Sequence, residues 1–200
     1  MKNLLLLLLF IPLISFGQVS EQEIKFDNYA PEEYSKMEIS FGGKYSDDVW
    51  KFKTGKQIIY FTPDDLVKAA EAFEGAYNKA VKWNKVADEN NVEKLMKVMP
   101  FSFSTTKGML EDSGFEVVGP KKAEFEFERF TFQGEAKSYF KASIFQNGDY
   151  GVRSAYFQFP SINVRNKEMV DEFLEFLNFM KSNKSIIDEK IGSSKADLFD

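Results

Sequence analysis

Three glutamates at alternate positions have the spacing in this sequence that is best suited to catalysis. They lie in the run Glu124-Phe-Glu126-Phe-Glu128. Alternate side chains of a strand project to one side about 6.6–6.8 Å apart, close to the separation of paired carboxylates in glycoside hydrolysis. A small carboxylate-dependent glycan hydrolase is therefore one hypothesis. We favour the alternative, a solvated strand face whose charges interrupt an aggregation-prone Phe-x-Phe run, with Lys141 opposite Glu128 as an exposed pair.

The composition excludes several other kinds of active site. The chain contains no histidine and no cysteine, so Ser-His-Asp and Cys-His catalysis, thiol redox chemistry and ordinary structural zinc sites are ruled out. The glycine-rich phosphate-binding patterns are absent, and residues 88–91 lack the spacing and the glycine of a calcium loop. We expect neither a metal nor a cofactor. Asn183-Lys184-Ser185 matches the glycosylation sequon, a pattern short enough to arise by chance.

The glutamates belong to three runs of alternating residues that predict an antiparallel three-stranded meander over residues 122–159. Gly134-Glu135 is typical of a two-residue type II′ turn, and Asn147-Gly148 is a strong hairpin signal. Counting outward from the first turn places Phe127 opposite Ala142. A shift of one residue would exchange the two faces, so the assignment depends on both turns.

The predicted inner face of the meander is apolar except for two arginines. Counting from both turns gives it Phe125, Phe127, Phe140, Ala142, Ile144, Gly151, Ala155 and Phe157, with Phe157 opposite Ser138. Arg129 and Arg153 lie diagonally on this face, where an unpaired charge is costly to bury. We expect them at the sheet margin, paired with carboxylates of the last helix. The candidates there are Glu168, Asp171, Glu172 and Glu175. A pocket for an acidic ligand is the alternative, because guanidinium groups match carboxylates well.

The predicted outer face carries an aromatic row beside the acidic one. Phe130, Tyr139 and Tyr156 are expected to cross the three strands side by side. A second structural layer could cover this row as ordinary core, which is the interpretation we favour. If the row is exposed, it forms an apolar patch of the kind that marks binding surfaces. The candidate ligand-binding residues are thus Phe130, Tyr139, Tyr156, Arg129 and Arg153.

Two helices are expected to cover the sheet. Thr62-Pro63-Asp64-Asp65 combines a Thr N-cap with Pro at the first helical position, and an apolar stripe then continues to about Asp88. Asn166 can cap a last helix that ends near Met180 and covers the inner face of the meander. Residues 183–200 are expected to form a loosely held tail.

The remaining segments give weaker signals. Val49–Lys53 and Gln57–Phe61 flank a Thr-Gly-Lys turn and predict an N-terminal hairpin in which Gly55 has positive φ. Met37–Phe41 alternates weakly. Val92–Val98 is interpreted as a further helical turn, Phe101–Thr105 as the entry to a strand, and residues 106–122 as a loop.

The first residues are typical of a secretory signal peptide over residues 1–17. Lys2 supplies the positive start, Leu4–Ile14 the apolar stretch, and Ser15-Phe16-Gly17 the small residues near a cleavage site. The apolar stretch is far shorter than the roughly 20 residues that span a bilayer, and no cysteine is present for lipid attachment. We expect a mature chain that begins near Gln18, without a transmembrane anchor, in the periplasm or outside the cell.

The net charge and the length of the chain restrict the partners and the folds that are expected. The net charge is −5 at pH 7, and no run contains more than two adjacent Lys or Arg, so nucleic acid is an unfavourable partner. Residues 18–182 have the length of a single domain with a full core. We predict an α+β fold, an antiparallel sheet packed against one central and one C-terminal helix. The expected function is that of an exported non-enzymatic binding protein of the cell envelope or extracellular space, with an unidentified protein or glycan as partner.

Overall fold

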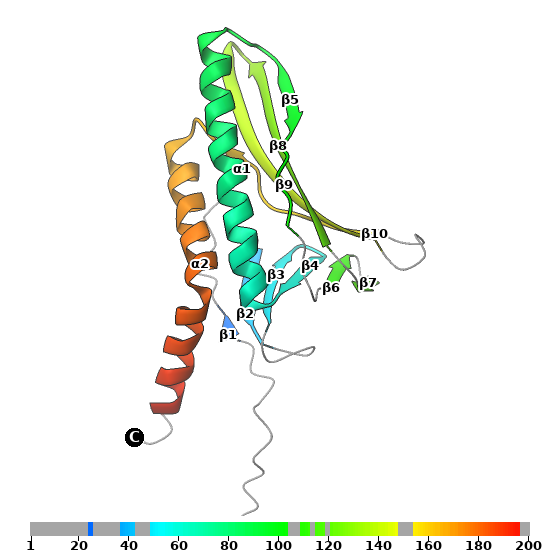
Figure 1. Cartoon of the computed structure of the whole chain (residues 1–200), viewed down its shortest axis with the longest axis vertical. Helices are drawn as coiled ribbons and strands as arrows, with labels where there is room; N and C mark the ends of the chain where they lie inside the picture. The colour runs from blue at the N-terminus through cyan, green and yellow to red at the C-terminus, as the bar shows by residue number, and fades with distance from the viewer. Residues whose placement is uncertain are drawn as a thin grey trace, which may run out of the picture.

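The structure of the chain is a computed structural model. It describes residues 24–25, 37–42, 49–103, 109–112, 115–118, 121–147 and 154–196. Within these ranges the fold is α+β, with two antiparallel sheets and two long helices (Figure 1). The predicted fold class is therefore confirmed.

The first sheet is built mainly from the N-terminal half of the chain. Its strands are β1 (Ile24–Lys25), β2 (Met37–Phe41), β3 (Trp50–Thr54), β4 (Gln57–Phe61), β6 (Met109–Asp112) and β7 (Phe115–Val118), in the spatial order β1-β2-β3-β4-β6-β7. The predicted hairpin between β3 and β4 is confirmed. Gly55 in its turn has φ of 58°, a conformation that glycine adopts without steric cost.

The second sheet contains the long hairpin of the predicted meander. Its strands are β5 (Leu95–Val98), β8 (Lys121–Phe132), β9 (Glu135–Asn147), β10 (Ser154–Gln158) and β11 (Ile162–Asn163). The spatial order is β10-β9-β8-β5, and β11 pairs with β9 beyond the end of β10. All pairings are antiparallel.

The two helices are α1 (Pro63–Glu89) and α2 (Lys167–Ala196). The Thr62 hydroxyl accepts a hydrogen bond from the Asp65 amide at 3.2 Å, so the predicted N-cap of α1 is confirmed. The Asn166 side chain likewise accepts from the Met169 amide at 3.2 Å. The two helices run side by side along the sheets (Figure 1).

The helices bury an aromatic core against both sheets. From α1, Phe73 packs edge-on against Phe125 of β8, with ring centroids 5.0 Å apart. From α2, Phe173 lies 5.5 Å from Phe140 of β9, and Phe179 lies 5.0 Å from Trp50 of the first sheet. The expectation that α2 covers the inner face of the meander is therefore incomplete, because α1 shares this role and α2 extends over the first sheet as well.

The register of the meander differs from the prediction, although the faces do not. Gln133 and Gly134, with φ of 51° and 80°, form the first turn, so Phe127 pairs with Phe140 and not with Ala142. Moving a two-residue turn by one position shifts the pairing by two, which keeps every side chain on its face. The second register is displaced further. Asn147 still belongs to β9 and pairs with Ser154, so Asn147-Gly148 is not a two-residue turn.

Other predicted boundaries are also wrong. Residues 95–98 are strand β5 and not a helical turn, and two strands, β6 and β7, occupy part of the expected loop over residues 106–122. Phe101 to Phe103 show no strand pairing, and Ser104 and Thr105 lie outside the described residues. The expected tail is wrong as well, since α2 continues to Ala196 and Asn183 within it is fully buried.

Candidate functional site

The outer face of the second sheet, defined by Glu124, Glu126, Glu128, Phe130, Phe132, Tyr139, Lys141 and Phe145 together with Met96 and Val98, is the candidate site. Alternation along β8 and β9 directs these side chains away from the helices. The inner-face neighbours Phe125, Phe127 and Phe140 are at most 1% exposed, whereas no outer-face side chain that the structure describes is buried. The predicted assignment of the two faces is thus confirmed, and the favoured cover over the outer one is not observed in the described part of the chain.

The aromatic row on this face is shorter than predicted. Phe130 and Tyr139 are diagonal neighbours whose rings stack, with centroids 5.8 Å apart and planes 20° apart. Both are half-buried. Tyr156 is not in this row, because its backbone pairs with Phe145, six residues along β9 from Tyr139. The Tyr156 side chain itself lies outside the described residues. The larger shift of the second register explains this difference.

The three glutamates share the outer face as predicted, but they line an open sheet surface. Lys141 is directly opposite Glu126 and reaches diagonally to form an ion pair with Glu128. A half-exposed pair of this kind contributes on the order of 0–1 kcal/mol to stability. Hollows of about 720 and 520 Å³ lie elsewhere on the described surface, and the lining of neither one includes Glu124, Glu126 or Glu128.

The first hollow lies where the two sheets meet. Glu38, Thr54, Gly55 and Gln57 of the first sheet and residues 158–161 line it. Here the amide of Gln158 donates to the side-chain oxygen of Gln57 at 3.3 Å. The second hollow lies between the β8–β9 turn and the start of α2, lined by Gly134, Glu135, Ala136, Lys137, Asn163, Arg165 and Asn166. Both cationic side chains that line this hollow are already in ion pairs, since Lys137 contacts Glu135 at 2.7 Å and Arg165 contacts Asp88 at 2.6 Å.

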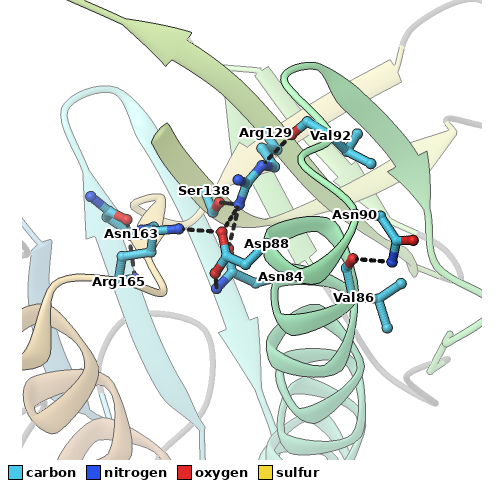
Figure 2. Close-up of polar contacts among 9 residues, drawn as sticks. All are labelled: Asn84, Val86, Asp88, Asn90, Val92, Arg129, Ser138, Asn163 and Arg165. Atoms are coloured by element: carbon cyan, nitrogen blue, oxygen red, sulfur yellow. Dashed lines mark hydrogen bonds and ion pairs between the residues drawn. The ribbon is translucent and has the colours of Figure 1, made fainter. Parts of the chain in front are cut away.

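Arg129 lies in a polar network at the end of α1 and not at a ligand pocket (Figure 2). It is 5% exposed, and its guanidinium lies 2.7 Å from Asp88. It also donates to the Val92 carbonyl at 2.6 Å, to Asn84 at 3.1 Å and to Ser138 at 3.4 Å. The expected ion pair therefore exists, but the carboxylate comes from α1 and not from α2. Arg153 lies outside the described residues.

Asp88 holds two arginines at once. Its Oδ1 lies 2.7 Å from Arg129 and 2.6 Å from Arg165, which approaches from the loop before α2. Loss of solvation opposes ionisation, but the hydrogen bonds and charges of Arg129 and Arg165 outweigh it, so the pKa of Asp88 lies below its ordinary value. This arrangement joins α1, β8 and the β11–α2 loop, and its geometry serves to hold these elements together.

Asn183, the residue of the sequon, has a structural role. It is 0% exposed, and its side-chain oxygen accepts a hydrogen bond from the Trp50 indole at 3.0 Å. Its amide donates to the carbonyls of Met180 at 2.7 Å and Pro63 at 3.2 Å. A side chain that is buried with its amide in use is closed to glycosylation in the folded protein.

The described residues give no cluster of three or more acidic side chains arranged to hold a metal ion. Neither α1 nor α2, over the residues described, has both the length and the apolar composition that crossing a bilayer requires.

Comparison of the chain with protein-family models, with curated proteins and with solved structures found no match.

One part of the candidate site does not follow from the sequence pattern. Met96 and Val98 of β5 lie opposite Glu128 and Glu126, and they are 67% and 57% exposed. The run Leu-Met-Lys-Val shows no alternation of polar and apolar residues, and four residues are too few to separate a strand period from a helical one. The interpretation of residues 92–98 as helical therefore misses the place of these two side chains on the outer face.

Proposed function

We propose that this chain is an exported, non-enzymatic binding protein that contacts a partner protein through the outer face of the second sheet. The observation that carries the proposal is the exposure of large apolar side chains there. Phe132, Met96 and Val98 are each more than half exposed. Met96 and Val98 lie directly opposite Glu128 and Glu126, and the stacked Phe130–Tyr139 pair lies on the same face. Exposed apolar side chains that adjoin polar ones on one face are typical of protein interaction sites.

The shape of the face supports a protein partner over the hydrolase alternative and over a glycan. The glutamates lie on an open sheet surface, and Glu128 is already engaged with Lys141. Enzyme and sugar sites need concave surroundings that hold the substrate in place. A broad face with aromatic, aliphatic and acidic side chains fits the larger contact area of a protein interface.

A photoreactive phenylalanine analogue placed at Phe132 tests the binding surface in the native host. The same analogue at Leu174, which is 41% exposed on α2, is the matched control. We expect a discrete crosslinked protein from position 132 and none from position 174. Equal crosslinking from both positions, or none from either, would contradict the proposal. A crosslinked product that carries glycan in place of protein would identify the partner as a sugar polymer.

Export is tested separately by sequencing the N-terminus of the protein recovered from its native host. We expect the mature chain to begin at or near Gln18, because the proposed signal peptide ends at Gly17. Recovery of a cytoplasmic protein that retains Met1 would remove the export component while leaving the binding surface to be judged by crosslinking.

A further inference from the structure

The edge strand β5 presents both side chains and backbone groups to solvent. It is the last strand in the order β10-β9-β8-β5, and the described residues place no strand beyond it (Figure 1). The Met99 amide donates to the Phe125 carbonyl at 2.8 Å. Since hydrogen-bonded and non-hydrogen-bonded pairs alternate in an antiparallel ladder, the N–H and C=O groups of Met96 and Val98 point away from β8. Met96 and Val98, whose backbone groups meet no further strand among the described residues, are thus also the residues with exposed apolar side chains.

The other side of this edge is basic. Trp83 of α1 is half-buried against Phe127, and the ammonium groups of Lys79 and Lys97 lie 5.5 and 5.3 Å from its ring centroid. Lys97 belongs to β5 and points to the inner face, since it pairs with Phe127. Two positive charges therefore flank one indole ring at the gap between α1 and the free edge.

These lysines lack acidic partners in the described part of the chain. Neither Lys79 nor Lys97 forms an ion pair there, and the same holds for Lys82, one helical turn from Lys79. Residues 75–87 contain three lysines and no acidic residue, and of the three only Lys85 forms an ion pair in the described part of the chain, with Glu89 at 3.9 Å, although the whole protein has a net charge of −5. The surface beside the edge is thus locally positive, and its charges are available to a partner.

We propose that β5 binds an acidic, extended segment of a partner protein by strand addition. The segment pairs its backbone with Met96 and Val98, as peptides do when they extend an open sheet edge. Its side chains on the α1 side are acidic and contact Lys79 and Lys97. Those on the other side are apolar and extend the exposed surface of Met96 and Val98. This inference rests on the proposed function, because β5 borders the same outer face.

A second copy of this chain is a poorer occupant. The antiparallel register that pairs Met96 with Val98 of another copy places Lys97 directly opposite its own counterpart, and like charges in that position destabilise a sheet. An acidic strand replaces this repulsion by attraction on the same side of the sheet.

Two blocked eight-residue peptides, one alternating Glu with Val and one alternating Lys with Val, test the charge requirement. Trp83 fluorescence reports binding, because Trp50 is 0% exposed and remote from the edge in the first sheet. We expect saturable binding of the Glu peptide that weakens with added salt. Equal binding of the Lys peptide, or no binding of the Glu peptide at millimolar concentration, would overturn the proposal.

Variants test the edge itself. Val98→Pro removes an N–H that points to solvent, which edge strands tolerate, and should weaken peptide binding by at least about tenfold while circular dichroism stays unchanged. The double variant K79E/K97E should weaken it by about tenfold or more, whereas the control K56E, which makes a single Lys-to-Glu change at the β3–β4 turn, should change it by less than about twofold. Unaltered affinity in Val98→Pro would refute strand addition.

Sedimentation and crosslinking of the variants distinguish a second copy of the chain from a partner protein, and strand addition from binding at the outer face. If sedimentation shows a dimer that becomes monomeric in Val98→Pro, the occupant is a second copy and the acidic-segment proposal fails. If the Glu peptide does not bind the wild-type protein while position 132 gives a crosslinked partner, strand addition fails and the outer-face binding function stands. If the Glu peptide binds the wild-type protein but not Val98→Pro, while position 132 gives no crosslink, strand addition stands and the outer-face binding function fails.

Discussion

Asp88 Oδ1 lies 2.7 Å from the guanidinium of the buried Arg129, and this ion pair connects the last turn of α1 to the C-terminal part of β8. The contact crosses from helix to sheet just before the chain leaves α1 for β5. The placement of the proposed edge strand therefore depends on it, because Arg129 also holds the Val92 carbonyl at the start of that connection.

Replacing Asp88 by Asn should lower the free energy of unfolding by about 1–2 kcal/mol at pH 7, because the buried Arg129 loses a charged partner. The loss is limited because the Asp88 carboxylate is 41% exposed to solvent. The pKa of Asp88 is lowered in the folded state, so its contribution is complete above the unfolded-state pKa and disappears as the pH falls through the folded-state pKa. Denaturant curves of the two proteins should thus converge in acid. A difference in unfolding free energy between the two proteins that stays constant at all pH values would contradict this role of the Asp88 carboxylate. Glu89→Gln, at an exposed position of the same helix, is the control.

Asn183→Ala should lower the free energy of unfolding by about 2–3 kcal/mol, because the Trp50 indole N–H and the Pro63 carbonyl lose their partner in the interior. Asn178→Ala, at an exposed position of the same helix, should change it by less than about 0.5 kcal/mol. Urea midpoints measured for both variants provide the comparison. If Asn183→Ala lowered the free energy of unfolding as little as Asn178→Ala does, the hydrogen bond from the Trp50 indole would not stabilise the fold.

Phe130→Ala and Tyr139→Ala should each lower the free energy of unfolding by about 0.5–1.5 kcal/mol through loss of the contact between the two rings. Phe140→Ala, one residue further along β9 on the inner face, should cost about 3–5 kcal/mol because that ring is 1% exposed. Denaturant midpoints separate the two cases. A loss above about 2.5 kcal/mol in both outer-face variants would mean that the stacked pair belongs to a core and would remove it from the candidate site.

Gly75→Ala should destabilise the protein even though alanine favours helices by about 1 kcal/mol. A Cβ at this position would lie 2.7 Å from the ring of Phe101, which packs against α1 there. Overpacking of this kind costs about 1–3 kcal/mol. The double variant with Phe101→Leu should recover part of the loss, as thermal unfolding can show. An increase in stability for Gly75→Ala alone would contradict this packing.

The elements that the sequence predicts well are those with local chemical signals. Thr62 and Pro63 fix the start of α1 by hydrogen bonding and a preset φ, and Gly55 marks the β3–β4 turn, so neither needs information from distant residues. The predicted faces of β8 and β9 are also correct, because Phe125 and Phe127 alternate with glutamates whatever the pairing partner is.

The errors occur where distant contacts decide the outcome. β5 is a strand because β8 offers it an edge, and the run Leu95–Val98 is too short to indicate this alone. The predicted end of α2 is too early because Asn183 looks like a tail residue until Trp50 supplies its partner. Asp88 could not be identified as the partner of Arg129, since no local pattern links residues 41 positions apart in a fold whose topology is unknown.

The bond between Trp50 and Asn183 also sets the order in which the chain can complete its fold during synthesis. Trp50 and Phe52 are fully buried in the first sheet, yet their aromatic cover comes from Phe179 and Phe176 of α2. A nascent chain that has reached only β11 lacks the Asn183 partner of the indole and both of these covering rings. The burial of Trp50 and Phe52 is therefore completed only after residues 176–183 of α2 have been synthesised.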